Sequence, residues 1–164
     1  MVLDVIEKRR SIRKFEIREV EEKKIKEILK AAMYSPSAMH LRPWEFFIVR
    51  DKGIKEKLSR TTPWCSFVKD APVVIIIAAK PTKRWVEDCA IAAENIYLEA
   101  TNQGLGTCFC QVMDENTERE EYVKNITKIP RDLRILCMMP IGYPAEKKEK
   151  HSENEFDESK VHYL

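Results

Sequence analysis

The sequence predicts an α+β or α/β fold, in which helices cover both sides of a sheet of roughly four or five strands. Two observations indicate it. The segment 72–79, PVVIIIAA, is continuously apolar and rich in β-branched residues, as expected of a strand that is buried on both faces. Segments with helical periodicity alternate with further apolar runs before and after it. Because single cores usually hold ~100 to 200 residues, the 164 residues are predicted to form one domain, 1–164.

Two longer helices are predicted from apolar stripes. Between Glu16 and Met33 the apolar residues fall largely on one helical face, and Ser35-Pro36 ends this helix. From Trp85 to Ala100 the apolar residues follow a helical spacing, and Gly104 can serve as the C-cap. The small residues of this second stripe predict a central, closely packed helix.

The remaining predicted elements are shorter. Asp51 is a suitable N-cap, and Gly142 closes the last apolar run. We expect a strand at 46–49, a helix from Asp51 through Leu58, a strand at 107–112, a helix at 115–126 and a strand at 133–141.

The C-terminal arm, about 145–164, has no apolar period and cannot build a core of its own. It nevertheless ends on the apolar sequence Val161-His-Tyr-Leu164. A disordered tail has little reason to end on an apolar anchor, so we expect an extension that docks across a partner subunit. Simple disorder is the alternative.

The charge balance excludes several classes of partner. The 29 Lys and Arg are nearly matched by 27 Asp and Glu, which leaves a net charge of +2 and no strong field for nucleic acid.

The N-terminus, MVLDVIEKRR, has neither the apolar run of a secretory signal nor a membrane span. We therefore expect a cytoplasmic protein that binds neither nucleic acid nor membrane.

The five cysteines are scattered through apolar segments and are predicted to be reduced thiols in the core. Cys108 and Cys110 would point to one face of a strand, where a redox or metal pair is an alternative to simple packing. Because no second pair of ligands stands at a suitable spacing, no metal site is predicted.

The basic segment Arg9-Arg10-Ser11-Ile12-Arg13 is the first candidate binding feature. Guanidinium groups match phosphate oxygens and keep their charge at any working pH, so closely set arginines with a hydroxyl can form a phosphate clamp. The alternative is a solvated basic surface.

Two further segments can approach a ligand. The segment 35–44, with two prolines and a Trp, is rigid without regular hydrogen bonds and can offer backbone groups and hydroxyls to a planar ligand. Gly104-Leu-Gly-Thr107 permits close backbone approach. A plain helix-to-strand loop and a helix C-cap are the respective alternatives.

Five segments in this order and spacing resemble the nitroreductase family of FMN enzymes: RRSIRKF, SPSAMHLRPWEFFIV, DAPVVIIIAA, ENIYLEATNQGLGTCF and PIGYPAE. The resemblance implies an α+β fold with a mixed or antiparallel sheet and a C-terminal extension that embraces the partner. It also implies a homodimer with FMN at the subunit interface. NADH or NADPH would supply hydride to the flavin, and an electron-poor small molecule such as a nitroaromatic or a quinone would accept it.

The resemblance also implies roles for individual residues, none of them a catalytic side chain. The phosphate and ribityl chain would be held by Arg9, Arg10, Ser11 and Arg13, and the flavin would be reached from the other subunit by Pro36, Ser37 and Ala38. The Leu105-Gly106 backbone would lie near the isoalloxazine ring, and Lys148 or Lys150 would supply the basic tail residue that the family places on the phosphate.

The chain departs from the family pattern at three positions. His40 stands where the family usually has Asn, and Arg42 where it usually has Gln. Contact of His40 with the flavin would use two ring nitrogens and could depend on pH, because imidazole takes up a proton near ~pH 6.5. Glu155 precedes Phe156 where the tail normally carries an Arg, so the phosphate contact from the tail is expected to differ.

Two other functions stay open at this point. One is a specialised flavin reductase or dehalogenase on the same scaffold, with Trp64, Arg84 or Trp85 recognising an aromatic substrate. The other is a flavin-binding protein without turnover. The fold alone does not choose among them.

Overall fold

The computed structural model describes residues 1–164 and contains one five-stranded antiparallel sheet. The strand order is β1-β2-β5-β3, and β4 also pairs with β5. The strands are β1 (Trp44–Val49), β2 (Val73–Ala79), β3 (Gly106–Thr107), β4 (Cys110–Gln111) and β5 (Arg134–Gly142). The predicted α+β fold with a helix-flanked antiparallel sheet is confirmed.

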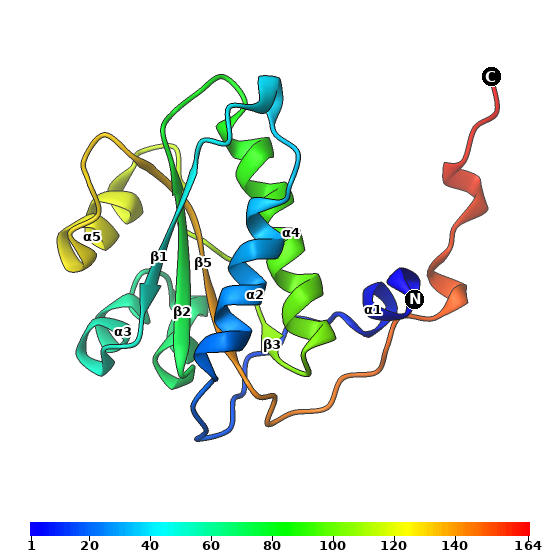
Figure 1. The fold of residues 1–164 in the computed structure, drawn as a ribbon, viewed down its shortest axis with the longest axis horizontal. Helices are drawn as coiled ribbons and strands as arrows, with labels where there is room; N and C mark the ends of the chain where they lie inside the picture. The colour runs from blue at the N-terminus through cyan, green and yellow to red at the C-terminus, as the bar shows by residue number, and fades with distance from the viewer.

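Helices cover both faces of the sheet (Figure 1). One face carries α2 (Glu22–Met33) and α4 (Trp85–Asn102), and the other carries α3 (Lys52–Leu58) and α5 (Glu118–Thr127). A 3-10 segment, η2 (Pro63–Asp70), packs beside α3 on that second face.

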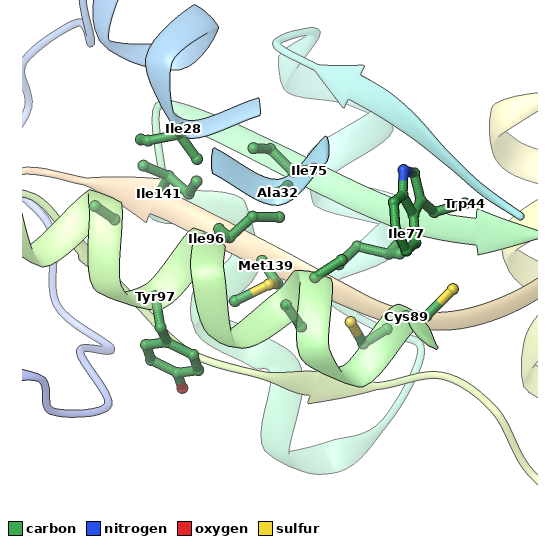
Figure 2. Packing of buried hydrophobic residues seen from close by; sticks show 14 of the residues in the cluster. Ile28, Ala32, Trp44, Ile75, Ile77, Cys89, Ile96, Tyr97, Met139 and Ile141 are labelled. Carbon is green, nitrogen blue, oxygen red and sulfur yellow. The ribbon is translucent and has the colours of Figure 1, made fainter. Parts of the chain in front are cut away.

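The strand β2 is buried along its whole length, as its apolar sequence predicts. Its side chains alternate between the two layers: Ile75 and Ile77 belong to the core beneath α2 and α4, while Ile76 belongs to the core beneath α3 and α5. Figure 2 shows Ile28 of α2 and Ile96 of α4 packed against this strand and against β5. The hydrophobic core thus fixes the position of α4, and α4 in turn positions the candidate site.

Two predicted elements differ from the structure. The helix expected from Glu16 begins at Glu22, because the preceding segment runs extended: Phe15 forms a bridge with Pro144, and the Glu16 N–H donates to the Tyr143 carbonyl at 2.9 Å. The strand expected at 107–112 is divided into β3 and β4. Between them, the Phe109 N–H donates to the Tyr97 hydroxyl at 2.7 Å instead of to a strand.

The two ends of the chain leave the body of the domain together. Helix α1 (Val2–Lys8) has no buried residue, and the arm from about 145 onward continues past it to the C-terminus (Figure 1). The arm contains only two short 3-10 turns, η3 (Glu153–Glu155) and η4 (Glu158–Lys160), and the side chains of Tyr163 and Leu164 are fully exposed. No helix has the length and apolar character needed to cross a membrane.

Candidate functional site

The basic segment 9–13 leaves α1 in an extended conformation and lies beside β3. Ser11 forms a parallel bridge with Thr107, and the Ile12 N–H donates to the Thr107 carbonyl at 2.9 Å. In an extended chain, alternate side chains point to opposite sides. Arg9, Ser11 and Arg13 therefore share one side, and Arg10 and Ile12 share the other.

The contacts of the side chains agree with this division. The Arg9 guanidinium lies 5.1 Å from the centre of the Tyr97 ring, and the Ser11 hydroxyl oxygen is 3.2 Å from the Tyr97 hydroxyl oxygen. Arg13 lies 5.9 Å from the centre of the Phe67 ring. On the opposite side, the Arg10 guanidinium donates to the Glu149 carbonyl of the arm. Three of the four residues predicted to form the clamp thus face one surface, and Arg10 anchors the arm.

Gly106 lets the basic segment approach β3 closely. A Cβ atom at this position would lie 2.6 Å from Ile12 side-chain atoms, which is nearer than a real Cβ atom can come. The chain reaches this point through Gly104, whose positive φ of 73° ends α4, and through the Leu105 N–H, which donates to the Ala100 carbonyl at 2.8 Å. The predicted Leu105-Gly106 backbone is therefore held next to the arginines by a glycine-dependent turn.

Tyr97 is a member of the site that the sequence did not single out. Its hydroxyl accepts the Phe109 N–H and pairs with the Ser11 hydroxyl, and burial raises its pKa. In Figure 2 its ring leaves α4 on the side away from Ile28 and Ala32. In the sequence Tyr97 is only one position in the helical stripe, so the pattern predicts packing and carries no signal for the hydrogen bonds.

All five cysteines are buried free thiols, as predicted. Cys108 and Cys110 do lie together, and Cys65 of η2 joins them. The hydrogen bond from Cys110 is the main cause that lowers the pKa of Cys108, and Arg13, Ser11 and Tyr97 lower it further. Cys108, a thiol with increased acidity, therefore lies close to Ser11 and Arg13.

The other side of the basic segment borders a cleft of about 370 Å³. Of the predicted site residues, Arg10, Leu105 and Lys148 line it. Its walls come from α1, the end of α4 and the start of the arm, so residues far apart in the sequence meet here.

The segment containing Pro36, Ser37, Ala38 and His40 lies elsewhere in the subunit. The Ala38 N–H donates to Asp88 Oδ1 at 2.9 Å, at the first turn of α4. Because α4 rises ~1.5 Å per residue, this contact is roughly 14 Å along the helix from Tyr97. His40 is exposed and has a positive φ of 55°. Within one subunit, the segment does not join the basic residues.

In the arm, the two predicted lysines already have carboxylate partners. Lys148 Nζ lies 3.1 Å from Glu146 Oε2, and Lys150 Nζ lies 3.2 Å from Glu7 Oε2. The tail side chain that contacts the Arg9 guanidinium is His151, whose Nε2 is 3.2 Å from Arg9 Nη2. No motif in the sequence singles out His151.

Of the three residues proposed to recognise an aromatic substrate, only Trp64 offers an exposed ring, and Arg119 lies 5.6 Å from its centre. Trp85 is buried in the core under Arg134, and Arg84 pairs with Glu87 at 2.9 Å.

The comparison with protein families decides the assignment, because the model described as the nitroreductase family matches residues 6–63 and 55–143. The chain belongs to the nitroreductase family. A protein of Methanothermobacter thermautotrophicus, provisionally named an NADH dehydrogenase/NAD(P)H nitroreductase, is 40% identical over 98% of this chain and 85% of its own length. The solved structure of an FMN-dependent nitroreductase from Clostridium difficile R20291 matches this family member with a TM-score of 0.93 at 39% identity, over 98% of both chains. An iodotyrosine deiodinase of Thermotoga neapolitana is 25% identical over 94% of this chain and 95% of its own.

Proposed function

We propose that this family member is an FMN-dependent oxidoreductase that takes hydride from NADH or NADPH and delivers it to an electron-poor small molecule, such as a nitroaromatic or a quinone. The observation that carries the proposal is the row of Arg9, Ser11 and Arg13 on one side of the basic segment. Through Ile12 on its other side, the same segment packs against the glycine turn at Leu105-Gly106. The relatives at 39% and 40% identity, named as nitroreductases, support the same reaction.

The donor groups of this row fit a flavin mononucleotide. Two guanidiniums and a hydroxyl supply fixed donors for a phosphate and a ribityl chain. We place the planar ring near the Leu105-Gly106 backbone, which stays close to the basic segment because Gly106 has no side chain and Ile12 packs against it. When bound, FMN would supply the hydride chemistry itself. The residues of the chain would orient it and exclude water from it.

A homodimer would complete this site. Pro36, Ser37, Ala38 and His40 lie near the first turn of α4, away from the basic residues of their own subunit, and we propose that they reach the flavin of the partner. The arm, about 145–164, would cross the partner. Large apolar side chains that are exposed in the single chain support this arrangement: Val2, Leu3, Ile6, Met39, Leu41, Phe156, Val161, Tyr163 and Leu164.

We infer the cellular compartment from the state of the cysteines. Five buried thiols without a disulfide are typical of proteins in a reducing environment, which supports a cytoplasmic location.

Reductive dehalogenation is the second candidate. The exposed Trp64 ring and the 25% identity to an iodotyrosine deiodinase favour it, but the relatives that are nearer in sequence favour nitroreduction. A flavin-binding protein without turnover would have the same fold but no acceptor.

A steady-state assay distinguishes the candidates. The FMN-loaded protein is supplied with NADH or NADPH and offered a nitroaromatic, a quinone and 3-iodotyrosine in parallel. Rapid reduction of the nitroaromatic or the quinone is expected. Turnover of 3-iodotyrosine alone would favour the dehalogenase, and no turnover with any of the three would contradict both enzymatic functions.

A further inference from the structure

His151 is the arm residue whose side chain contacts the Arg9 guanidinium. Its backbone N–H donates to the Glu7 carbonyl at 2.8 Å, which fixes it beside α1. Its Nδ1 is 2.6 Å from Glu155 Oε2, and its Nε2 is 3.2 Å from Arg9 Nη2. One ring nitrogen is thus engaged by a carboxylate, and the other faces a guanidinium of the candidate phosphate clamp.

The chemistry of the two partners assigns the protons. Arginine has only donors, so His151 Nε2 must accept from Arg9, and the ring proton lies on Nδ1, which donates to Glu155. The hydrogen bond with His151 is also the main cause that lowers the pKa of Glu155, which is therefore held as a carboxylate. In this arrangement His151 Nε2 occupies a donor of Arg9.

An incoming phosphate would change the hydrogen bond between Arg9 and His151. Phosphate oxygens are acceptors, and they would compete with Nε2 for the Arg9 donor. If Nε2 takes up a proton, it becomes a donor, releases Arg9 and adds a positive charge beside it, while Glu155 stabilises the imidazolium. Binding of phosphate and binding of the proton therefore favour each other.

The other charged groups around His151 have different contacts and do not take its place beside Arg9. Glu94 of α4 lies 4.0 Å from Arg9 Nε, and burial raises its pKa. Arg10 donates to the Glu149 carbonyl and contributes positive charge near Glu155. Glu7 is paired with Lys150 at 3.2 Å. His151 is thus the arm's basic side chain that meets Arg9.

We propose that His151, oriented by Glu155, binds the phosphate of the cofactor together with Arg9 in its protonated form, so that FMN is held more tightly as the pH falls. The pair of His151 and Glu155 would then do the work that the sequence analysis assigned to a tail lysine. The proposal rests on the proposed function, because it concerns the same FMN site.

The experiment compares FMN with riboflavin, which lacks the phosphate. Dissociation constants are measured by flavin fluorescence with the full chain at about pH 5.5 and about pH 8, on either side of the range in which imidazole titrates. For the unmodified protein, FMN binding should weaken by roughly tenfold at the higher pH, since one linked proton is lost. Riboflavin binding should not change.

The variant His151→Gln separates this effect from the phosphate's own ionisation, whose second pKa is about 6. It should weaken FMN binding at the lower pH by about tenfold and abolish the preference for low pH, while riboflavin binding stays unchanged. Glu155→Gln should move the transition to lower pH, because the imidazolium loses its carboxylate. His162→Gln, the exposed histidine near the end of the arm, is the matched control and should behave like the unmodified protein.

Three results would overturn the proposal. In the first, His151→Gln binds FMN like the unmodified protein at both pH values. In the second, it loses FMN and riboflavin equally, which indicates a structural role. Both leave the proposed function standing. In the third, the unmodified protein binds neither flavin, and the proposed function fails with the inference.

Discussion

The Tyr97 hydroxyl oxygen lies 3.2 Å from the Ser11 hydroxyl oxygen, which joins helix α4 to the segment that carries the arginines. The same hydroxyl accepts the Phe109 N–H at 2.7 Å, between β3 and β4. A single side chain thus connects the packed core to the arginine segment and to the loop between β3 and β4.

Replacing this hydroxyl should affect both stability and binding. Tyr97→Phe leaves the Phe109 N–H without its acceptor, which costs about 1–3 kcal/mol of unfolding free energy when the group is shielded from water. Thermal or urea denaturation measures the loss, and FMN binding should weaken with it. Tyr122→Phe is the matched control, because the Tyr122 hydroxyl donates to the Lys57 carbonyl at the exposed surface. Equal effects of the two substitutions would contradict the role of Tyr97.

The alternation along the basic segment predicts unequal effects of its arginines. Arg9→Ala and Arg13→Ala each remove a charged donor from the proposed FMN side, and each should cost about 1.5–3 kcal/mol of binding free energy. Arg10→Ala should cost less, because Arg10 binds the arm on the other side. Titration with FMN tests this order. If Arg10→Ala has the largest effect, the assignment of the FMN side is wrong.

The close approach at Gly106 predicts a steric effect. Gly106→Ala places a methyl group 2.6 Å from Ile12 atoms, so the basic segment must move away from β3. FMN binding should fall by at least about tenfold, since charge-assisted contacts depend on donor geometry. Gly53→Ala in α3 is the control: its Cβ would stand 3.3 Å from Asp51 Oδ1, and alanine favours helix. Unchanged FMN binding in Gly106→Ala would refute the tight packing of this turn.

The arm should detach at acid pH through Glu146. This carboxylate accepts the Arg13 N–H at 2.6 Å and the Lys14 N–H at 3.1 Å, and the first of these bonds is the main cause that lowers its pKa. A lowered pKa in the folded state means that the stabilisation is present above the ordinary value of ~4.3 and is lost as the pH falls through the folded-state value. Limited proteolysis with pepsin should cut the arm faster as the pH falls below about 4.

The variant Glu146→Gln provides the comparison for that experiment. It should show fast cleavage of the arm over the whole pH range in which the protease works, because the carboxylate contact is absent throughout. A pH profile that matches the unmodified protein would show that another group holds the arm.

The sequence predicted the fold better than the site. The continuous apolar run of β2 and the stripes of α2 and α4 determine burial directly, so their positions were recovered. The extended stretch before Glu22 was missed, because its pairing with Tyr143 and Pro144 is long-range and leaves no local pattern.

In the site, the arginine segment and the glycine turn carry visible motifs, whereas Tyr97 and His151 do not. Tyr97 has an ordinary core position, and its role arises from the contacts of its hydroxyl with Ser11 and with the Phe109 N–H between β3 and β4. The role that we propose for His151 depends on its contacts with Arg9 and Glu155, and the contact with Arg9 joins residues 142 positions apart in the chain. The sequence shows the charge of Lys148 and Lys150 but not the ion pairs that they form with Glu146 and Glu7, so their role at the phosphate stays a prediction.

The central claim is that this chain binds FMN and reduces it with a nicotinamide cofactor. The most direct test is the visible spectrum of the protein with added FMN, freed of unbound flavin and titrated anaerobically with NADH or NADPH. The account predicts a retained band near ~450 nm that bleaches as either nucleotide is added. A protein that retains no flavin, or whose flavin band stays unchanged with both nucleotides, would contradict it.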